Sequence, residues 1–339
     1  MQKTVLYCKH DFEKQISEEM KVTGLVTREE FYVNSSDGIH MIHGYRWYDT
    51  EKKIKGVLQI VHGMLEYMER YEELAQYMAA AGYFVVGHDH LGHGNSVNDP
   101  SELGYVGKDG AVLWLKDMEL VRKMGASYAP KAPYIILGHS MGSFLVRRYL
   151  IYYGKRVDGA VIMGTGHQPA VLVKAGLCLT CLSMLRRGPR GHNALLDNMT
   201  CAGFARRYPD NAHTGSWMSR DPQVMVSALQ DEKMNFQFSL NAFESLFRTV
   251  EEATDPKRAA RMPKKLPLLV LAGDEDPVGE NGKGVRRFQA MLKRIGMEKV
   301  TCILYHQNRH ELIHDLDKER VFADILRWTN TIEKQAGGK

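Results

Sequence analysis

Ser140 stands in the part of the chain best suited to nucleophilic chemistry. Tyr134-Ile-Ile-Leu137 has the composition of a short buried strand, Gly138-His-Ser-Met-Gly142 follows it directly, and a helical pattern begins at Ser143. Gly-x-Ser-x-Gly between a strand and a helix is typical of a nucleophile elbow, where a sharp, strained turn exposes the serine hydroxyl. The unpaired N–H groups of the helix N-terminus would also favour a developing negative charge. We therefore predict a nucleophile at Ser140; the alternative is a glycine-rich turn with an incidental serine.

A serine hydroxyl needs an adjacent base, and that base needs a third group to hold it. In an open parallel sheet such groups come from loops at the carboxyl ends of strands. Two late loops offer them, 273–278 and 306–311. For the acid we predict Asp276, with Asp274 as the alternative, which could instead be a turn residue. For the base we predict His310 over His306, because the loop must leave the strand before a side chain can fold back over the serine.

Attack of Ser140 on a carbonyl group would create an oxyanion, which needs preorganised N–H donors. One donor should be the backbone N–H of Met141, directly after the serine. We predict that the other is the N–H of Met64, because His62-Gly63-Met64 follows a buried strand and Gly63 permits a close backbone approach.

The elements that would position these residues alternate between strand and helix. Apolar runs typical of strands buried on both faces alternate with helical patterns, and this predicts an α/β fold with a mostly parallel, doubly wound sheet. An earlier pair of strands is joined by a turn with an Asp-Gly signal. The expected strands are 29–34, 39–48, 55–61, 83–89, 134–137, 157–164, 267–273 and 300–305, and the expected helices of the core are 70–81, 109–127, one from 143, 284–295 and 318–333.

A long interruption follows the strand that ends at 164. Residues 165–263 show helical patterns but no clear strands, and the segment is far longer than an ordinary crossover. We therefore predict a helical cap at 165–263, inserted into a core of residues 1–164 and 264–339. Residues 1–26 are an N-terminal extension to which we assign no role, with a short helix expected near 12–19.

Composition limits the partners and the compartment. The chain has 45 Lys and Arg against 40 Asp and Glu, and the net charge of +5 is too mild for a nucleic-acid-binding surface. We expect no membrane-spanning helix and no secretory signal. Five cysteines, an odd and sparse number, indicate a reducing, cytoplasmic setting. Cys178-Leu-Thr-Cys181 could be a redox site or half a zinc site, but we expect buried free thiols there, and no metal or organic cofactor.

With these features in this order, the chain resembles the α/β-hydrolase superfamily, in the branch of monoacylglycerol lipases, lysophospholipases and serine aminopeptidase-like hydrolases. The resemblance rests on His62-Gly63-Met64-x-Glu66, Asp89-His-Leu-Gly-His-Gly-Asn-Ser96, Gly138-His-Ser-Met-Gly142, Gly273-x-x-Asp276 and Tyr305 to His310. It implies the α/β-hydrolase fold, a triad of Ser140, Asp276 and His310, and oxyanion donors at Met64 and Met141. The loop at 89–96 matches a structural motif of the branch. Tyr67 departs from it, because lipases of this branch often have histidine there.

Substrate preference should depend on the cap. Residues 170–185 are strongly apolar and are followed by Arg186-Arg-Gly-Pro-Arg190. As a helix this segment is too short to cross a bilayer; it could lie at a lipid interface, or pack with its apolar face buried on the main domain. A helical face over 235–247 could roof an apolar pocket or belong to the core. We expect Leu177, Phe236 and Phe243 to contact the substrate.

The sequence thus predicts a serine ester hydrolase that works through an acyl-enzyme. The expected substrates are single-chain lipid esters such as monoacylglycerols or lysophospholipids, and the expected location is cytoplasmic, with peripheral membrane contact through the cap. A short-chain carboxylesterase or a serine aminopeptidase is the alternative. A non-catalytic hydrolase-like binding protein is a more distant one, because such proteins typically lack a member of the triad.

Overall fold

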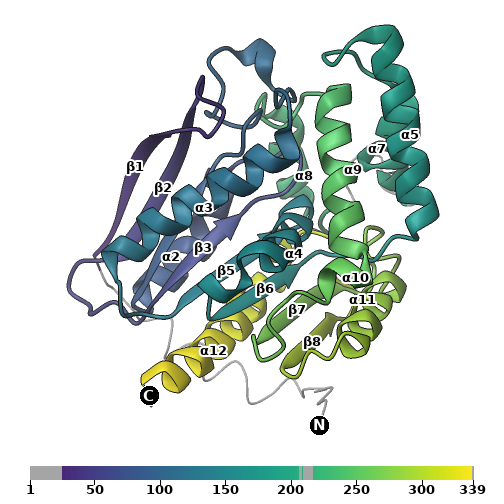
Figure 1. The fold of residues 1–339 in the computed structure, drawn as a ribbon. Helices are drawn as coiled ribbons and strands as arrows, with labels where there is room; N and C mark the ends of the chain where they lie inside the picture. Colours follow the sequence, from purple (N-terminus) through teal and green to yellow (C-terminus); the bar gives the residue numbers. More distant parts are fainter. Residues whose placement is uncertain (1–24, 206–207, 209–216, 338–339) are drawn as a thin grey trace.

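A computed structural model describes residues 25–205, 208 and 217–337 of the chain. Eight strands form one sheet in the order β1-β2-β4-β3-β5-β6-β7-β8 (Figure 1). The expected helix near 12–19, and all of the N-terminal extension except its last two residues, lie outside the described residues. The strands are β1 (Val26–Asn34), β2 (Met41–Asp49), β3 (Gly56–Val61), β4 (Tyr83–His88), β5 (Tyr134–His139), β6 (Gly159–Met163), β7 (Leu268–Gly273) and β8 (Val300–Tyr305).

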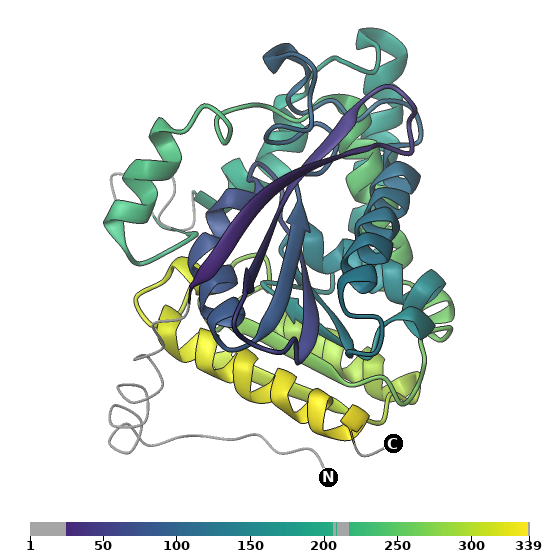
Figure 2. The ribbon, with the colours of Figure 1, turned by 90° about the vertical axis from the view of Figure 1, so that its left-hand side faces the viewer.

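The sheet is antiparallel at one edge and parallel elsewhere. β1 and β2 form a hairpin, and β2 also runs antiparallel to β4, whereas β4, β3, β5, β6, β7 and β8 are mutually parallel. Figure 2 shows the hairpin facing the viewer, strongly twisted relative to the strands behind it. The Asp-Gly turn signal marks its tip, where Gly38 has a φ of 75° that glycine adopts without strain.

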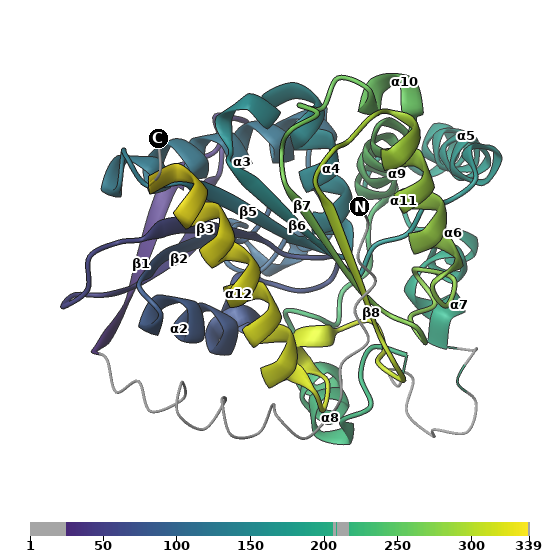
Figure 3. The same ribbon diagram turned by 90° about the horizontal axis from the view of Figure 1, so that it is seen from below.

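Helices cover both faces of the sheet, and each face has its own hydrophobic core (Figure 3). Side chains alternate along each strand, so that in β5 Ile136 packs into one core while Ile135 and Leu137 pack into the other. Such burial on both faces explains the continuous apolar runs of the sequence. One face is covered by α2 (Glu72–Ala80) and α12 (Lys318–Gly337), and the other by α3 (Gly110–Tyr128), α4 (Met141–Tyr153) and α11 (Lys283–Arg294).

The segment between β6 and β7 is helical in its described part, with no strand there. Figure 1 shows α5 and α9 side by side beyond the sheet. α9 begins later than the sequence pattern indicated, at Leu240, because the side chain of Ser239 accepts a hydrogen bond from Ala242 N and caps the helix. The helices are α5 (Ala170–Arg187), α6 (Ala194–Met199), α7 (Cys201–Ala205), α8 (Pro222–Gln230), α9 (Leu240–Thr254) and α10 (Pro256–Ala259).

α5 packs in a way that the sequence did not predict. Its buried face consists of small or polar residues, Val173, Gly176, Thr180 and Ser183. Gly176 permits close packing on α9, since a Cβ atom there would lie 2.7 Å from the ring of Phe247. The prediction of buried thiols was therefore wrong: the free thiol of Cys178 is exposed and that of Cys181 is only partly buried. The exposed side chains include Val171, Leu172, Leu182 and Leu185.

Candidate active site

The turn between β5 and α4 has the strained geometry expected of a nucleophile elbow. Ser140 has φ 52° and ψ −120°, a conformation that L-residues rarely adopt. Both flanking glycines are sterically required. A Cβ atom at Gly138 would overlap the carbonyl oxygen of Gly142, and one at Gly142 would overlap the carbonyl oxygen of Val61. The strand and the helix therefore approach closely only because these positions are glycine.

His310 and Asp276 come together from the loops after β8 and β7. The Nδ1 atom of His310 lies 3.0 Å from Oδ2 of Asp276, and both side chains are buried. The other carboxylate oxygen of Asp276 accepts a hydrogen bond from Val278 N at 2.8 Å, which fixes the carboxylate plane. The indole of Trp217 packs against the imidazole, with ring centroids 5.1 Å apart. The alternative residues Asp274 and His306 pair with each other at 2.8 Å, and the His306 side chain is largely exposed to solvent.

The loop after β3 lies directly against the elbow. A Cβ atom at Gly63 would be 3.0 Å from Cβ of Ser140, so this glycine allows the loop backbone to approach the serine. Met64 and Met141, whose N–H groups are the predicted oxyanion donors, both line the same cavity as Ser140 and His310. The predicted donors thus lie on two backbone segments next to the serine.

Ser140 opens into a cavity of about 1420 Å³ between the core and the cap. Such a volume exceeds the usual range of small-molecule sites. The wall is mostly apolar, and its larger apolar side chains include Phe144, Met199, Phe204, Trp217, Leu229, Leu246, Phe247 and Val250.

The three predicted substrate contacts are not among the residues that line this cavity. Phe243 is fully buried in the core on the α4 side, and Phe236 packs against the rings of His93 and Phe238. Leu177 is partly buried against the same core. The cavity face of α9 bears Leu246, Phe247 and Val250, whereas Phe243 is buried in the core.

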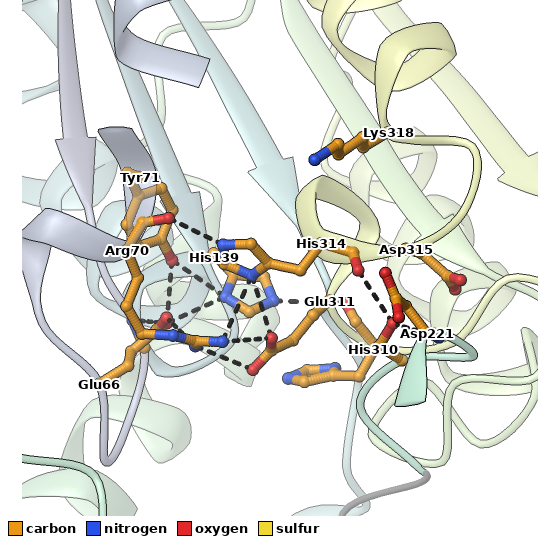
Figure 4. Close-up of polar contacts among 12 residues, drawn as sticks. Glu66, Arg70, Tyr71, His139, Asp221, His310, Glu311, His314, Asp315 and Lys318 are labelled. Carbon is orange, nitrogen blue, oxygen red and sulfur yellow. Dashed lines mark hydrogen bonds and ion pairs between the residues drawn. The ribbon is translucent and has the colours of Figure 1, made fainter. Parts of the chain in front are cut away.

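A buried polar network lies behind the elbow and was not predicted from the sequence (Figure 4). Glu66 accepts hydrogen bonds from Gly63 N and from the hydroxyl of Tyr71, and its Oε1 lies 3.0 Å from Nδ1 of His139. Arg70 pairs with Glu66 at 3.1 Å and with both carboxylate oxygens of Glu311, at 3.0 and 2.7 Å. The network therefore joins the loop after β3, residues 62–67 (called the oxyanion loop below), to the loop that contains His310.

Neighbouring opposite charges shift the pKa values of the ionisable groups in this network. Burial opposes the ionisation of Glu66, but the charge and the hydrogen bond of His139, with Arg70, lower the pKa of Glu66 below its usual range. Burial likewise opposes the charge on His139, and Glu66 outweighs it and raises the pKa of His139. Glu311 behaves like Glu66, because Arg70 and His314 overcome burial and hold its pKa well below the usual range. The local signals in the sequence are that Glu66 belongs to the motif after the third strand and that Glu311 directly follows the predicted base.

The loop at 89–96 holds other parts of the core together. Asp89 lies 2.8 Å from Nδ1 of His43 in β2, and it accepts hydrogen bonds from Met68 N at 2.7 Å and from Asn95 N at 2.9 Å. Asp89 is buried and does not line the cavity. These contacts agree with the structural role that the resemblance implied.

The model of the family described as serine aminopeptidase S33 matches residues 52–317. The chain belongs to this family of α/β-hydrolases. Its members are hydrolases, and the match includes the elbow, both late loops and the whole cap.

Similar proteins include ester hydrolases. A monoacylglycerol lipase of Mycolicibacterium smegmatis is 26% identical over 89% of this chain and 97% of the relative. A probable lysophospholipase L2 of Haemophilus influenzae is 27% identical over 83% of this chain and 84% of the relative. A thermostable carboxyl esterase from Bacillus coagulans, solved in complex with glycerol, superposes with a TM-score of 0.84 at 26% identity, over 91% of this chain and 99% of the esterase. The chain is thus an ester hydrolase.

Proposed function

We propose that this chain hydrolyses the carboxylic ester bond of single-chain lipids, such as monoacylglycerols or lysophospholipids, through an acyl-enzyme on Ser140. One observation supports the proposal above all: Ser140 and His310 open into a large cavity whose wall is mostly apolar. An acyl chain can bury its surface there while its ester carbonyl lies at the serine.

The reaction takes two acyl transfers. His310 accepts the proton of Ser140 at Nε2 as the hydroxyl oxygen attacks the ester carbon, and Asp276 stabilises the imidazolium through Nδ1–H. The N–H groups of Met64 and Met141 hold the oxyanion. Collapse of the tetrahedral intermediate breaks the ester C–O bond, and His310 returns the proton to the leaving alcohol. Water then repeats the sequence on the acyl-serine, releasing the fatty acid and restoring Ser140.

The charged groups of the cavity favour an ester over a peptide with a free amino terminus. Binding such an amine calls for a carboxylate that is not already neutralised. Among the described residues three glutamates line the cavity, but Glu66 and Glu311 are paired with Arg70, and Glu280 is paired with Arg287. The apolar wall and these engaged carboxylates support a lipid ester as the substrate.

We also propose that the cap touches a lipid surface while the enzyme takes up substrate. α5 exposes Val171, Leu172, Leu182 and Leu185, and its last turn bears Arg186 and Arg187. Exposed apolar side chains beside arginines suit the interface of an anionic membrane. No helix in the described parts of the chain is long and apolar enough to span a membrane. A cytoplasmic location stays a prediction from the cysteine content.

The test is release of oleic acid from monoolein and of p-nitrophenol from p-nitrophenyl acetate, with Ser140→Ala measured beside the wild type. The proposal predicts release from both esters by the wild type and a loss of at least about a thousandfold in the variant. Cleavage of the short ester alone would replace the lipid substrate with a short-chain one. Equal rates for the two proteins would remove Ser140 from the mechanism.

A further inference from the structure

The segment 217–235, which contains α8, crosses the cavity as a strap. Trp217, Met218, Leu229 and Met234 of this strap line the cavity. Figure 3 shows α8 standing away from the sheet, beyond the start of α12. α8 buries Met225 and Ala228, and hydrogen bonds join each end of the strap to the core.

Several hydrogen bonds fasten the amino-terminal end of the strap to the loop that contains His310. Glu311 N donates to the carbonyl oxygen of Met218 at 2.7 Å, and the hydroxyl of Ser219 donates to the carbonyl oxygen of His314 at 2.9 Å. Arg220 adds an ion pair with buried Asp315 at 2.8 Å. Backbone, hydroxyl and charged contacts act together here, so this end should open only when the histidine loop itself unfolds.

At its carboxyl-terminal end the strap runs into Phe236 and Phe238, which pack against the core, and its contact with the oxyanion loop is made by one tyrosine. The hydroxyl of Tyr67 donates to Oδ2 of Asp231 at 2.6 Å, across 164 positions of sequence. The ammonium group of Lys233 lies 5.2 Å from the centre of the Tyr67 ring. A hydrogen bond to a carboxylate is strong for its kind, but a single one at a partly buried site is far easier to open than the set at the other end.

Asp231 also shapes the turn that follows α8. Its other carboxylate oxygen accepts a hydrogen bond from Lys233 N at 2.9 Å, and its carbonyl oxygen accepts from Met234 N and Asn235 N at 3.0 and 3.1 Å. This turn presents Met234 and Asn235 to the cavity. Contact between Tyr67 and Asp231 therefore sets the position of a part of the cavity wall.

We propose that the Tyr67–Asp231 hydrogen bond is a latch that closes the strap over the acyl-binding cavity. The amino-terminal end acts as the fixed hinge, and the latched end completes the wall around a long acyl chain. Tyr67 is then a positioning residue that determines preference for long-chain esters. The preference for long chains rests on the proposed function, whereas the latch itself does not.

Hydrogen–deuterium exchange tests the latch without any substrate. In Tyr67→Phe the amides of 225–235 should exchange about tenfold faster than in the wild type, a factor that corresponds to about 1.4 kcal/mol. Amides of 309–315 should keep their wild-type rates. Asp231→Asn keeps an acceptor for Lys233 N and can still bond to the phenol, so it should resemble the wild type.

Tyr152→Phe is the matched control. This variant loses a comparable hydrogen bond, from the hydroxyl of Tyr152 to Glu252 at 2.8 Å, and Tyr152 does not line the cavity. Unchanged exchange at 225–235 in Tyr67→Phe would overturn the proposal. So would equal acceleration at 225–235 and 309–315, because the tyrosine would then support the whole site and not one end of the strap.

Kinetics test the preference for long chains. Tyr67→Phe should raise KM for monoolein about tenfold with kcat within twofold, and should leave kcat/KM for p-nitrophenyl acetate within twofold. An equal loss on both esters, or no change in KM for monoolein, would contradict the role in chain-length preference. Failure of the wild type to cleave monoolein would instead refute the proposed function, and the exchange result would still decide the latch.

Discussion

Asp276 and His310 form a carboxylate–imidazole pair whose imidazole lines the cavity beside Ser140. Asp276 is wholly buried, and its two oxygens are engaged by His310 and by Val278 N. This arrangement favours a proton on Nδ1 of the imidazole, which would keep Nε2 available as the base that we propose. The pair formed by Asp274 and His306 has the same chemistry but lies at an exposed surface.

Substitution distinguishes these two pairs. Asp276→Asn should lower kcat by about 10⁴-fold, because the amide favours the wrong tautomer of His310, with little change in KM. Asp274→Asn should leave kcat within twofold, and thermal unfolding of both variants serves as the control for folding. A large loss of kcat in Asp274→Asn with an active Asp276→Asn would reverse the assignment.

Arg70 stabilises the polar network behind the elbow, because it is the cation between two buried carboxylates. Arg70→Met should lower the free energy of unfolding by about 3–5 kcal/mol, since it leaves Glu66 and Glu311 buried without this cation. Urea unfolding measures the loss. The triple variant Glu66→Gln, Arg70→Met, Glu311→Gln should recover most of it, as the unpaired charges are gone. A loss below about 1 kcal/mol in Arg70→Met would mean that the network is not held by charge.

At the scale of elements, α5 divides its two faces in an unusual way. The face toward α9 is small and polar, and the side chain of Leu185 on the other face is 84% exposed. The close contact at Gly176 lets α5 pack through its smallest residues, and Leu182 and Leu185 are left exposed to solvent. An apolar surface of this kind on a cap is where a lipid bilayer would be contacted.

Two leucines of α5 test this contact. Leu182→Ser with Leu185→Ser should weaken binding to vesicles of anionic phospholipid by roughly tenfold, at about 25 cal/mol per Å² of apolar surface kept from water. Co-sedimentation measures binding, and hydrolysis of soluble p-nitrophenyl acetate should stay at the wild-type rate. Unchanged sedimentation would show that α5 does not touch the membrane.

At the scale of the whole molecule, a set of buried neutral histidines should make the fold sensitive to acid. Burial lowers the pKa of His88 and of His93 to about 3, with a further contribution from His62, and it lowers the pKa values of His62 and His90 as well. Below pH 6.5, the ordinary pKa of histidine, these side chains bind protons in the unfolded chain but stay neutral in the folded chain. Each such histidine then costs about 1.4 kcal/mol of stability per pH unit. The pKa values of His40, His43 and His139 are raised, so these residues add stability below pH 6.5, but that gain is bounded and does not grow as the pH falls.

The free energy of unfolding should therefore fall steeply from pH 6.5 toward pH 4. His88 has no hydrogen-bond partner for either ring nitrogen in the described part of the chain. His88→Leu therefore removes one of the histidines that bind a proton only in the unfolded chain, and it breaks no hydrogen bond. Urea unfolding at several pH values should show a slope smaller by about 1.4 kcal/mol per pH unit in this variant. Parallel curves for variant and wild type would contradict the account.

Local patterns were enough to predict most of the fold. Strands buried on both faces, the Asp-Gly hairpin and the elbow are each specified by neighbouring residues, and all are confirmed. The contacts of the cap are long-range, so the periodicity of 170–185 could not reveal that its glycine and hydroxyl face is the buried one. A capping side chain also decides where a helix starts when periodicity alone does not, as Ser239 does for α9. Arg70 pairs with Glu66 nearby and with Glu311 at a distance of 241 positions in the sequence, which no local pattern encodes.

Cleavage of a lipid ester at Ser140 is tested most directly by trapping the nucleophile with a long-chain alkyl fluorophosphonate and mapping the adduct by peptide mass spectrometry. We expect one adduct, on Ser140. Excess monoolein should slow its formation, and heat-denatured protein should not form it. An adduct on another residue, or labelling of Ser140 that monoolein does not slow, would contradict the claim that a lipid ester is cleaved at this serine.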